Sequence, residues 1–270
     1  MGQTIACANQ KGGVGKTTTV VNVGSYLALF GERVLIIDLD PQGNATSGLG
    51  LDRNSIERSI YDAVVDGVSI KDLTVEGPVE GLDVVPSAIA LAGAEVELAP
   101  VEGRERRLAR LLAEVADDYD FILIDCPPSL GLLTVNALTA ADSVLIPLQC
   151  EYYALEGLTQ LLATLDLIRD HLNPELDIKG VVLTMFDGRT KLSADVAGEV
   201  RRHLGDHVFK TVIPRNVRLS EAPSHGQPIS RYAPDSTGAL AYAALATELR
   251  ARETPDDTDR SASAEAMMTS

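Results

Sequence analysis

Short apolar runs alternate along the chain with stretches in which apolar residues recur every three or four positions. The runs are rich in β-branched residues, and most are bounded by Asp, Pro or Gly. Such runs are typical of strands that are buried on both faces. The predicted strands are Ile5–Ala8, Val34–Ile37, Val84–Val85, Phe121–Ile124, Val144–Ile146 and Val181–Leu183.

Helical periodicity occupies much of the chain between these runs. Gly31 is expected to end the first helix, because glycine favours the left-handed conformation found just past a helix. Asn173-Pro174 is expected to end the third, since a residue before proline avoids the helical region. The five apolar stripes are Val20, Val23, Leu27 and Phe30; Leu108, Leu111, Leu112 and Val115; Leu155, Leu158, Leu162 and Leu165; Leu192, Val196, Val200 and Leu204; and Leu240, Ala244, Leu245 and Leu249.

This alternation predicts an α/β fold: a doubly wound, mostly parallel sheet with helices on both faces. A chain of 270 residues is long enough for one large α/β domain or for two small ones, and we expect residues 1–252 to form a single domain. No internal repeat is present. Residues 253–270 are polar, acidic and small, and are expected to be a disordered tail.

Composition supports a cytoplasmic protein with a large core. Apolar residues make up 45% of the 270 residues, which is enough for such a core. The N-terminus has no charged-then-apolar leader, and no apolar run approaches the roughly 18 residues that span a bilayer. Cys7, Cys126 and Cys150 have no paired spacing, so they are interpreted as buried apolar side chains in a reducing compartment.

Charge is unevenly distributed. The net charge of −16 argues against a surface that attracts nucleic acid everywhere. Between Arg189 and Arg231, however, eight Lys and Arg stand against four Asp and Glu, so this segment carries +4 and the rest carries −20. We interpret the segment as a basic patch on an acidic body; scattered solvated arginines are the alternative.

A glycine-rich stretch follows the first predicted strand and precedes the first predicted helix. Its glycines allow the backbone to curl so that N–H groups point at phosphate oxygens, and the helix N-terminus adds partial positive charge. Lys16 can reach the β- and γ-phosphates, and the Thr17 hydroxyl can bind Mg²⁺. Gln10 stands where the usual pattern has its first glycine. The predicted site for ATP and Mg²⁺ is Lys11, Gly12, Gly13, Val14, Gly15, Lys16, Thr17 and Thr18.

Acidic residues end two further predicted strands. Asp38 and Asp40 follow Val34–Ile37, and Asp125 follows Phe121–Ile124. The carboxyl ends of parallel strands meet at one edge of a sheet, so these acids are expected beside the phosphate loop. Asp125 is expected to hold Mg²⁺ through water. Either of the first two aspartates could position water or metal, or could instead cap a helix.

Five segments resemble the ParA/Soj branch of the deviant Walker-A ATPases, and the resemblance covers roughly residues 2–250. They are KGGVGKTTT, DLDPQGNAT, FILIDCPPS, EYYALEGL and PRNVRLSEAPSHGQPI. The resemblance implies that Lys11 crosses a dimer interface to the ATP of the other protomer, where Gly12 must be small. It implies that Asp40 orients the attacking water and that Asp125 is the Walker-B acid. It also implies that Pro214 and Asn216 pack near adenine and that Arg189 and Arg218 contact DNA.

The same resemblance implies a switching cycle. ATP would hold a homodimer together, the dimer would bind double-stranded DNA without sequence preference, and slow hydrolysis would release it. A ParB-like centromere-binding partner would accelerate hydrolysis. The protein would then be associated with the nucleoid and not with a membrane.

Three other functions compete with this interpretation. A MinD-like membrane ATPase needs a basic amphipathic C-terminal helix, but the tail carries five acids and no Leu, Phe or Ile follows Leu249. An electron-transfer iron protein needs cysteines that hold a cluster between protomers. A DNA-binding scaffold would hold ATP without hydrolysing it. An N-terminal helix-turn-helix is not expected, because the loop begins at Lys11.

Overall fold

The structure, a computed structural model, describes residues 2–151 and 154–252. Within these residues eight strands form one sheet in the order β3-β4-β2-β5-β1-β6-β7-β8. Only the β3–β4 pair is antiparallel among the described strands. The predicted α/β class with a mostly parallel sheet is therefore confirmed. The strands are β1 Gln3–Cys7, β2 Val34–Asp38, β3 Val75–Glu76, β4 Leu82–Val85, β5 Phe121–Asp125, β6 Ser143–Gln149, β7 Asp177–Phe186 and β8 Val208–Pro214.

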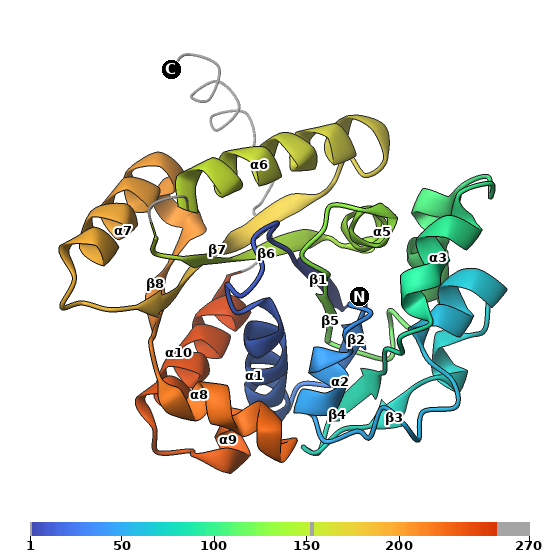
Figure 1. Cartoon of the computed structure of the whole chain (residues 1–270), viewed down its shortest axis with the longest axis horizontal. Helices are drawn as coiled ribbons and strands as arrows, with labels where there is room; N and C mark the ends of the chain where they lie inside the picture. Colours follow the sequence, from blue (N-terminus) through green and yellow to red (C-terminus); the bar gives the residue numbers. More distant parts are fainter. Residues whose placement is uncertain (1, 152–153, 253–270) are drawn as a thin grey trace.

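Helices cover both faces of the sheet (Figure 1). Successive strand residues point to opposite faces, so Ile5 and Cys7 join one hydrophobic core while Ala6 joins the other. The first core is completed by α1, α2, α9 and α10, and the second by α3 to α7. The helices are α1 Lys16–Leu29, α2 Asn44–Gly48, α3 Leu91–Leu98, α4 Arg107–Leu112, α5 Leu132–Ala140, α6 Ala154–His171, α7 Lys191–Leu204, α8 Val217–Glu221, α9 Ile229–Tyr232 and α10 Thr237–Ala251.

Two predicted helix ends are confirmed. Gly31 follows α1 with φ 90, and its N–H donates to the Ala28 carbonyl over 2.9 Å. A residue with a Cβ would be strained at this φ, which explains the glycine. Helix α6 ends at His171, two residues before Asn173-Pro174.

Several residues of the predicted apolar stripes do not face the core. Leu192 is 47% exposed and Leu240 62% exposed, and Phe30 is only partly covered at 38%. In α10 the buried stripe includes Tyr242, Leu245 and Leu249, whereas Ala244 is exposed. The prediction gave Tyr242 no weight, although its ring is buried and its hydroxyl lies 3.2 Å from that of Thr19 on α1.

Several elements were missed. Strand β8 carries the exposed Lys210, and the backbone N–H groups of Lys210 and Thr211 donate to the Glu248 carboxylate of α10. In β8, an edge strand, Lys210 and Thr211 interrupt the apolar residues, so it lacks the continuous apolar run that marks the buried strands. Strand β3 has two residues, which is too short to detect. Helices α2, α3, α5, α8 and α9 were also not predicted.

Strand pairing brings the predicted acids together. Cys7 at the end of β1 pairs with Asp125 at the end of β5, and Asp125 pairs on its other side with Asp38 at the end of β2. The loops that leave these three strands therefore start at one edge of the sheet. This edge, above α1 in Figure 1, carries the candidate site.

Candidate functional site

The loop between β1 and α1 has the curled backbone that its glycines predict. Gly13 has φ 73 and Gly15 has φ 92, values that residues with a Cβ rarely adopt. The Asn9 side chain fixes the start of the loop: its Nδ2 donates to the Pro147 carbonyl over 2.7 Å, and its Oδ1 accepts from the Lys11 N–H over 3.0 Å. At the other side, the Thr184 hydroxyl of β7 donates to the Val14 carbonyl over 2.8 Å.

Lys16 lies inside this curl. It is the first residue of α1 and is only 7% exposed. Its Nζ donates to the carbonyl of Asn9 over 3.0 Å and to that of Lys11 over 3.3 Å. The loop therefore holds the ammonium group beside the helix N-terminus, where both favour an anion.

Thr17 and Asp125 form the second part of the site. The Thr17 hydroxyl donates to Asp125 Oδ2 over 2.7 Å, while Asp125 Oδ1 is buried with no hydrogen-bond partner among the described residues. Burial, and then the nearby Asp38 carboxylate, raise the pKa of Asp125 well above its ordinary value. A buried carboxylate oxygen without a partner is costly unless a cation or water is bound there. The oxygen donor set of Thr17 and Asp125 fits Mg²⁺.

Asp38 is the buried anchor of the segment that follows β2. Its Oδ2 accepts from the Thr46 N–H over 2.8 Å and from the Thr46 hydroxyl over 2.7 Å, and its Oδ1 accepts from the Asp40 N–H over 3.3 Å. Burial raises the pKa of Asp38 to about 6, against the lowering effect of these hydrogen bonds. Asp38 therefore ties β2, α2 and the backbone of Asp40 together.

Asp40 lies just beyond this anchor and is 8% exposed. Its Oδ1 accepts from the Gln42 N–H over 2.9 Å, as in a side-chain-stabilised turn. Among the described residues no hydrogen bond is made to the other carboxylate oxygen, which can accept one, as the ordering of a water would require.

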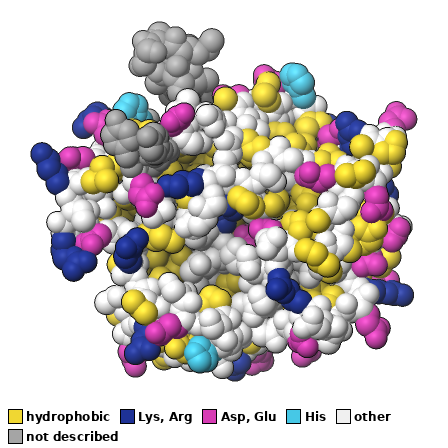
Figure 2. All heavy atoms as spheres, in the orientation of Figure 1, with side chains coloured by type: hydrophobic (Ala, Val, Ile, Leu, Met, Phe, Trp, Pro, Cys, Tyr) yellow, Lys and Arg dark blue, Asp and Glu magenta, His cyan; other side chains and the backbone are white. Residues whose placement is uncertain are grey.

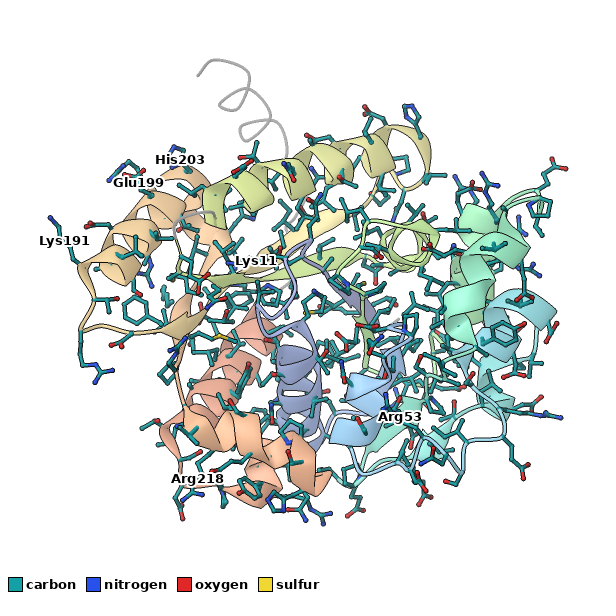
Figure 3. All side chains as sticks on the ribbon, in the orientation of Figure 1. Lys11, Arg53, Lys191, Glu199, His203 and Arg218 are labelled. Atoms are coloured by element: carbon teal, nitrogen blue, oxygen red, sulfur yellow. The ribbon has the colours of Figure 1, made fainter. Side chains whose placement is uncertain are left out.

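Lys11 and Gly12 lie on the outer side of the loop. Lys11 Nζ donates to Glu151 Oε2 over 2.6 Å, and the side chains are 39% and 47% exposed. Figure 3 shows Lys11 at the loop, near the centre of this face. A Cβ built on Gly12 would have no heavy atom within 4 Å, so nothing within the described chain requires glycine at this position. Glu151 was not predicted to have a role.

The predicted adenine residues lie at the end of β8. Pro214 pairs with Phe186 at the end of β7. The Asn216 side chain begins α8: its Oδ1 accepts from the Arg218 N–H over 2.8 Å, and its Nδ2 donates to the Thr237 hydroxyl over 2.7 Å. Asn216 is thus fixed in place by capping, a role that explains its presence even without a nucleotide.

The predicted DNA-binding arginines are exposed and ion-paired. Arg189 lies 2.8 Å from the Asp187 carboxylate, whose pKa it holds at about 2, and Arg218 lies 2.8 Å from the Glu221 carboxylate. Their side chains are 89% and 59% exposed. Lys191, two residues after Arg189, and Arg218 both lie on the left side of the molecule in Figure 3. Lys and Arg side chains are frequent on that side in Figure 2, where acidic side chains separate them.

Cys7, Cys126 and Cys150 are buried free thiols, as predicted. No helix in the described part of the chain is long and apolar enough to span a bilayer. Tyr152 and Tyr153 of the EYYALEGL segment, and the predicted tail 253–270, lie outside the described residues.

A parallel sheet whose first strand leads through a glycine-rich loop, past a buried lysine, into a helix defines a phosphate-loop nucleotide-binding protein. A family model described as "AAA domain" matches residues 2–178. The chain is also 60% identical over 251 residues to the sporulation initiation inhibitor protein Soj of Bacillus subtilis (strain 168), a match that covers 93% of this chain and 99% of that protein. It belongs to the Soj/ParA family of chromosome-partitioning ATPases, which confirms the resemblance stated above.

A second curated relative agrees with this assignment, and a solved structure with another name is similar in fold and sequence. The chromosome-partitioning ATPase Soj of Treponema pallidum (strain Nichols) is 53% identical over 253 residues, which covers 94% of this chain and 99% of that one. Among solved structures, a Mycobacterium smegmatis protein named cobyrinic acid a,c-diamide synthase, with bound ADP and magnesium, has a TM-score of 0.82. It is 40% identical, and the match covers 96% of this chain and 100% of that chain.

Proposed function

We propose that this protein binds ATP and Mg²⁺ in the loop Lys11–Thr18 and uses slow ATP hydrolysis to switch a DNA-binding homodimer on and off during chromosome partitioning. The observation that carries the proposal is the geometry around Lys16 and Asp125. A buried ammonium group lies within a curled backbone, and beside it a hydroxyl faces a buried carboxylate with an unpartnered oxygen. This set of groups suits a polyphosphate and its metal ion.

Each group has a place in ATP binding. The loop N–H groups and the N-terminus of α1 would hold the phosphates, and Lys16 would neutralise charge between the β- and γ-phosphates. Thr17 would bind Mg²⁺ directly and Asp125 through water. Bound Mg²⁺ would neutralise charge that builds up on the phosphate oxygens during transfer. Pro214 and Asn216 would lie near the base.

Hydrolysis requires two more groups. Asp40, held by the Asp38 anchor, would orient the attacking water, which supplies the positioning on which phosphoryl transfer depends. Lys11 would reach the γ-phosphate bound by the other protomer, past Gly12, where the two loops approach closely. Its contact with Glu151 must break first. The second lysine comes from the other subunit. ATP therefore holds the dimer together, and the dimer completes the catalytic site.

The basic segment would bind DNA in the dimer. Arg189 and Arg218 are exposed and can exchange their carboxylate partners for phosphates. The protein carries −16 overall, so one monomer patch attracts DNA weakly and two adjacent patches do better. DNA binding would place the protein at the nucleoid in the cytoplasm, and a ParB-like centromere-binding protein would accelerate hydrolysis and release the dimer.

Turnover measurements test the proposal. ATP hydrolysis is measured for the protein alone, with duplex DNA, and with DNA plus a ParB-like protein from the same organism. We expect a slow basal rate that rises with the full mixture. A protein that binds ATP but hydrolyses none in any mixture would be the DNA-binding scaffold considered above.

The variant Lys16→Ala tests the phosphate loop directly. Loss of the buried ammonium group should abolish ATP binding, dimer formation and DNA binding together, because each step depends on the one before. Equilibrium dialysis with labelled ATP measures the first step. Lys71→Ala is the control, since Lys71 is an exposed lysine paired with Asp118 over 2.8 Å. Near-normal ATP affinity in Lys16→Ala would refute the assignment of the loop.

A further inference from the structure

Two glycines far apart in the sequence touch backbone to backbone. Gly50 lies in the turn after α2, and Gly226 ends the short 3-10 helix Ala222–His225. Their φ values are +85 and +61, both in the left-handed region. A Cβ on Gly50 would lie 2.8 Å from the Gly226 carbonyl oxygen, and a Cβ on Gly226 would lie 2.8 Å from Gly50 Cα. Neither position accepts a side chain unless the backbone moves.

Gly50 is connected to the phosphate-binding edge of the sheet. Thr46 donates two hydrogen bonds to Asp38, and the Leu51 N–H donates back to the Thr46 carbonyl over 3.2 Å. The Gly50 N–H donates to the Ser47 carbonyl over 3.0 Å. The turn is therefore fixed to the segment that also carries Asp40.

Gly226 is connected to Arg218. The 3-10 helix continues α8 without a break, and the Gly226 N–H donates to the Pro223 carbonyl over 3.1 Å. Glu221 accepts from Arg218 over 2.8 Å and from the Tyr232 hydroxyl over 3.1 Å, so its carboxylate links α8 to α9. The segment 217–232 thus forms one unit that includes the arginine.

The two units have room to move beside the glycine contact. A cavity of about 260 Å³ opens between the first turn of α1, α2 and the 3-10 helix. Residues from all three line it, among them Thr17, Thr18, Ser47, Gly48, Ala222 and Pro223. In Figure 1, α2 and the α8–α9 segment lie on either side of the lower part of α1. At the contact itself, the atoms nearest to an added Cβ on either glycine all belong to the backbone, so a change of side-chain rotamer at these atoms cannot absorb a displacement.

We infer that the contact between Gly50 and Gly226 transmits the nucleotide state of the Asp38–Gly43 segment to the unit that carries Arg218. The inference rests on the proposed function for the sites at its two ends. Packed backbones have few alternative arrangements, so a shift at one side must move the other. A direct route along the chain, from the predicted adenine residues Pro214 and Asn216 into α8, is the competing explanation.

Hydrogen–deuterium exchange of residues 217–232, with and without a non-hydrolysable ATP analogue and Mg²⁺, tests the inference. We expect nucleotide to slow exchange at least fivefold in the wild-type protein. In Gly50→Ala and Gly226→Ala this slowing should fall below twofold, while the affinity for the analogue stays within threefold of wild type. Gly67→Ala is the matched control: Gly67 has φ +76, but an added Cβ meets nothing within 4 Å. It should respond like the wild type.

The outcomes separate the two routes. Full nucleotide-dependent protection in both alanine variants, or none in the wild type, overturns the inference; the first result favours the route through Pro214 and Asn216. If the glycine variants do not fold, Thr46→Val decides the question, because it removes the hydroxyl that donates to Asp38. It should reduce the protection of residues 217–232 to below twofold, and full protection in this variant overturns the inference.

DNA binding is measured on the same samples. A wild-type protein that shows the protection but no ATP-dependent DNA binding refutes the proposed function and leaves the coupling in place. If the wild type binds DNA with ATP, we compare the ratio of DNA affinity with ATP to DNA affinity with ADP in each variant. This ratio should be at least tenfold lower in Gly226→Ala than in the wild type, and unchanged in Gly67→Ala. An unchanged ratio in Gly226→Ala counts against the coupling.

Discussion

Two lysines of one loop have opposite surroundings. Lys16 is buried among backbone carbonyls, whereas Lys11 makes a half-exposed ion pair with Glu151. Exposed ion pairs contribute about 0–1 kcal/mol, so Lys11 can leave its partner at low cost. Lys16 is already placed where phosphates would lie. The structure therefore agrees with a fixed role for Lys16 and an exchangeable one for Lys11.

The first residue-scale prediction concerns Glu151→Gln. Removal of the carboxylate should free Lys11 in both protomers, and the homodimer formed with a non-hydrolysable ATP analogue should tighten by up to about thirtyfold, which corresponds to about 1 kcal/mol from each protomer. Sedimentation over a range of protein concentrations measures this. Asp118→Asn is the control, because it removes the acid of another exposed lysine pair. A weaker dimer in Glu151→Gln would mean that Glu151 supports the interface and does not compete for Lys11.

The second concerns Asp40→Ala. Asp38 still anchors the segment, so ATP should bind and dimers should accumulate, while turnover falls well over tenfold because the water is no longer oriented. Phosphate release and light scattering give the two readouts. Asp52→Ala is a close control, since Asp52 Oδ1 also accepts from the N–H two residues on, over 3.0 Å. If Asp40→Ala turns over normally, Asp40 is only a turn residue.

At the scale of elements, strands that are buried on both faces are predicted from the sequence better than strands that are partly exposed. All six predicted strands lie inside the sheet, where β-branched runs are continuous, and the two strands that were not predicted, β3 and β8, are its edges. The edge strand β8 was not predicted because Lys210 and Thr211 interrupt its apolar residues. The backbone N–H groups of these two residues donate to the Glu248 carboxylate on α10. Such a contact between distant segments leaves no periodic signal.

In the candidate site, too, some residues can be predicted from the sequence and others cannot. The loop, Asp38, Asp40 and Asp125 could be placed because strand ends in a parallel sheet share an edge. Glu151 and Thr46 could not, since a single acid or threonine has no pattern that links it to Lys11 or Asp38. Their roles depend on side-chain contacts that only the folded chain creates.

The contact between β7 and the end of α10 yields a prediction about pH. Lys179 on β7 is 7% exposed, and its Nζ donates to Gln3 Oε1 over 2.7 Å and to the Arg252 carbonyl. Burial, followed by the charge of Arg252, lowers the pKa of Lys179 from 10.5 to about 8. Between these values the unfolded chain binds more protons than the folded one. The free energy of unfolding should therefore rise as pH rises from about 8 to 10.5. Below pH 8, burial of the charged Lys179 lowers the free energy of unfolding by its full amount, about 3 kcal/mol.

Urea unfolding at pH 7, 8, 9 and 10 checks this by comparison with Lys179→Met. The variant lacks the titrating group, so its stability relative to the wild type should be highest at pH 7 and should decline towards pH 10. The hydrogen bonds that it loses add a constant offset only. Lys210→Met on the neighbouring strand β8 is the control, because Lys210 is exposed and should leave the pH dependence unchanged. Parallel curves for wild type and Lys179→Met would contradict the prediction.

At the scale of the whole molecule, charge decides how DNA binding must work. The segment Arg189–Arg231 carries +4 against −20 elsewhere, and two of its arginines, Arg189 and Arg218, are paired with Asp187 and Glu221. DNA phosphates must displace Asp187 and Glu221, and the acidic body repels the duplex at longer range. A single patch is therefore expected to bind too weakly to matter at physiological salt.

The last prediction follows from this balance. If Arg189 and Arg218 each meet one phosphate per protomer, the ATP-bound dimer makes about four contacts, and the log–log dependence of affinity on salt should have a slope of about −3.6. Arg218→Ala should flatten the slope by nearly two units and weaken binding equally on any duplex sequence, with ATP affinity unchanged. Fluorescence anisotropy on two unrelated duplexes, from low to physiological salt, measures both effects.

Two comparisons make this test decisive. Lys71→Ala removes one positive charge from each protomer at a residue outside the basic segment, so it should leave the slope within half a unit of wild type if contacts matter more than net charge. The double variant Arg189→Glu plus Arg218→Glu should bind no DNA even at low salt. DNA binding that persists without ATP would refute the need for the ATP-bound dimer. A double variant that binds as tightly as wild type would show that the +4 segment is a solvated face and that no DNA contact lies there.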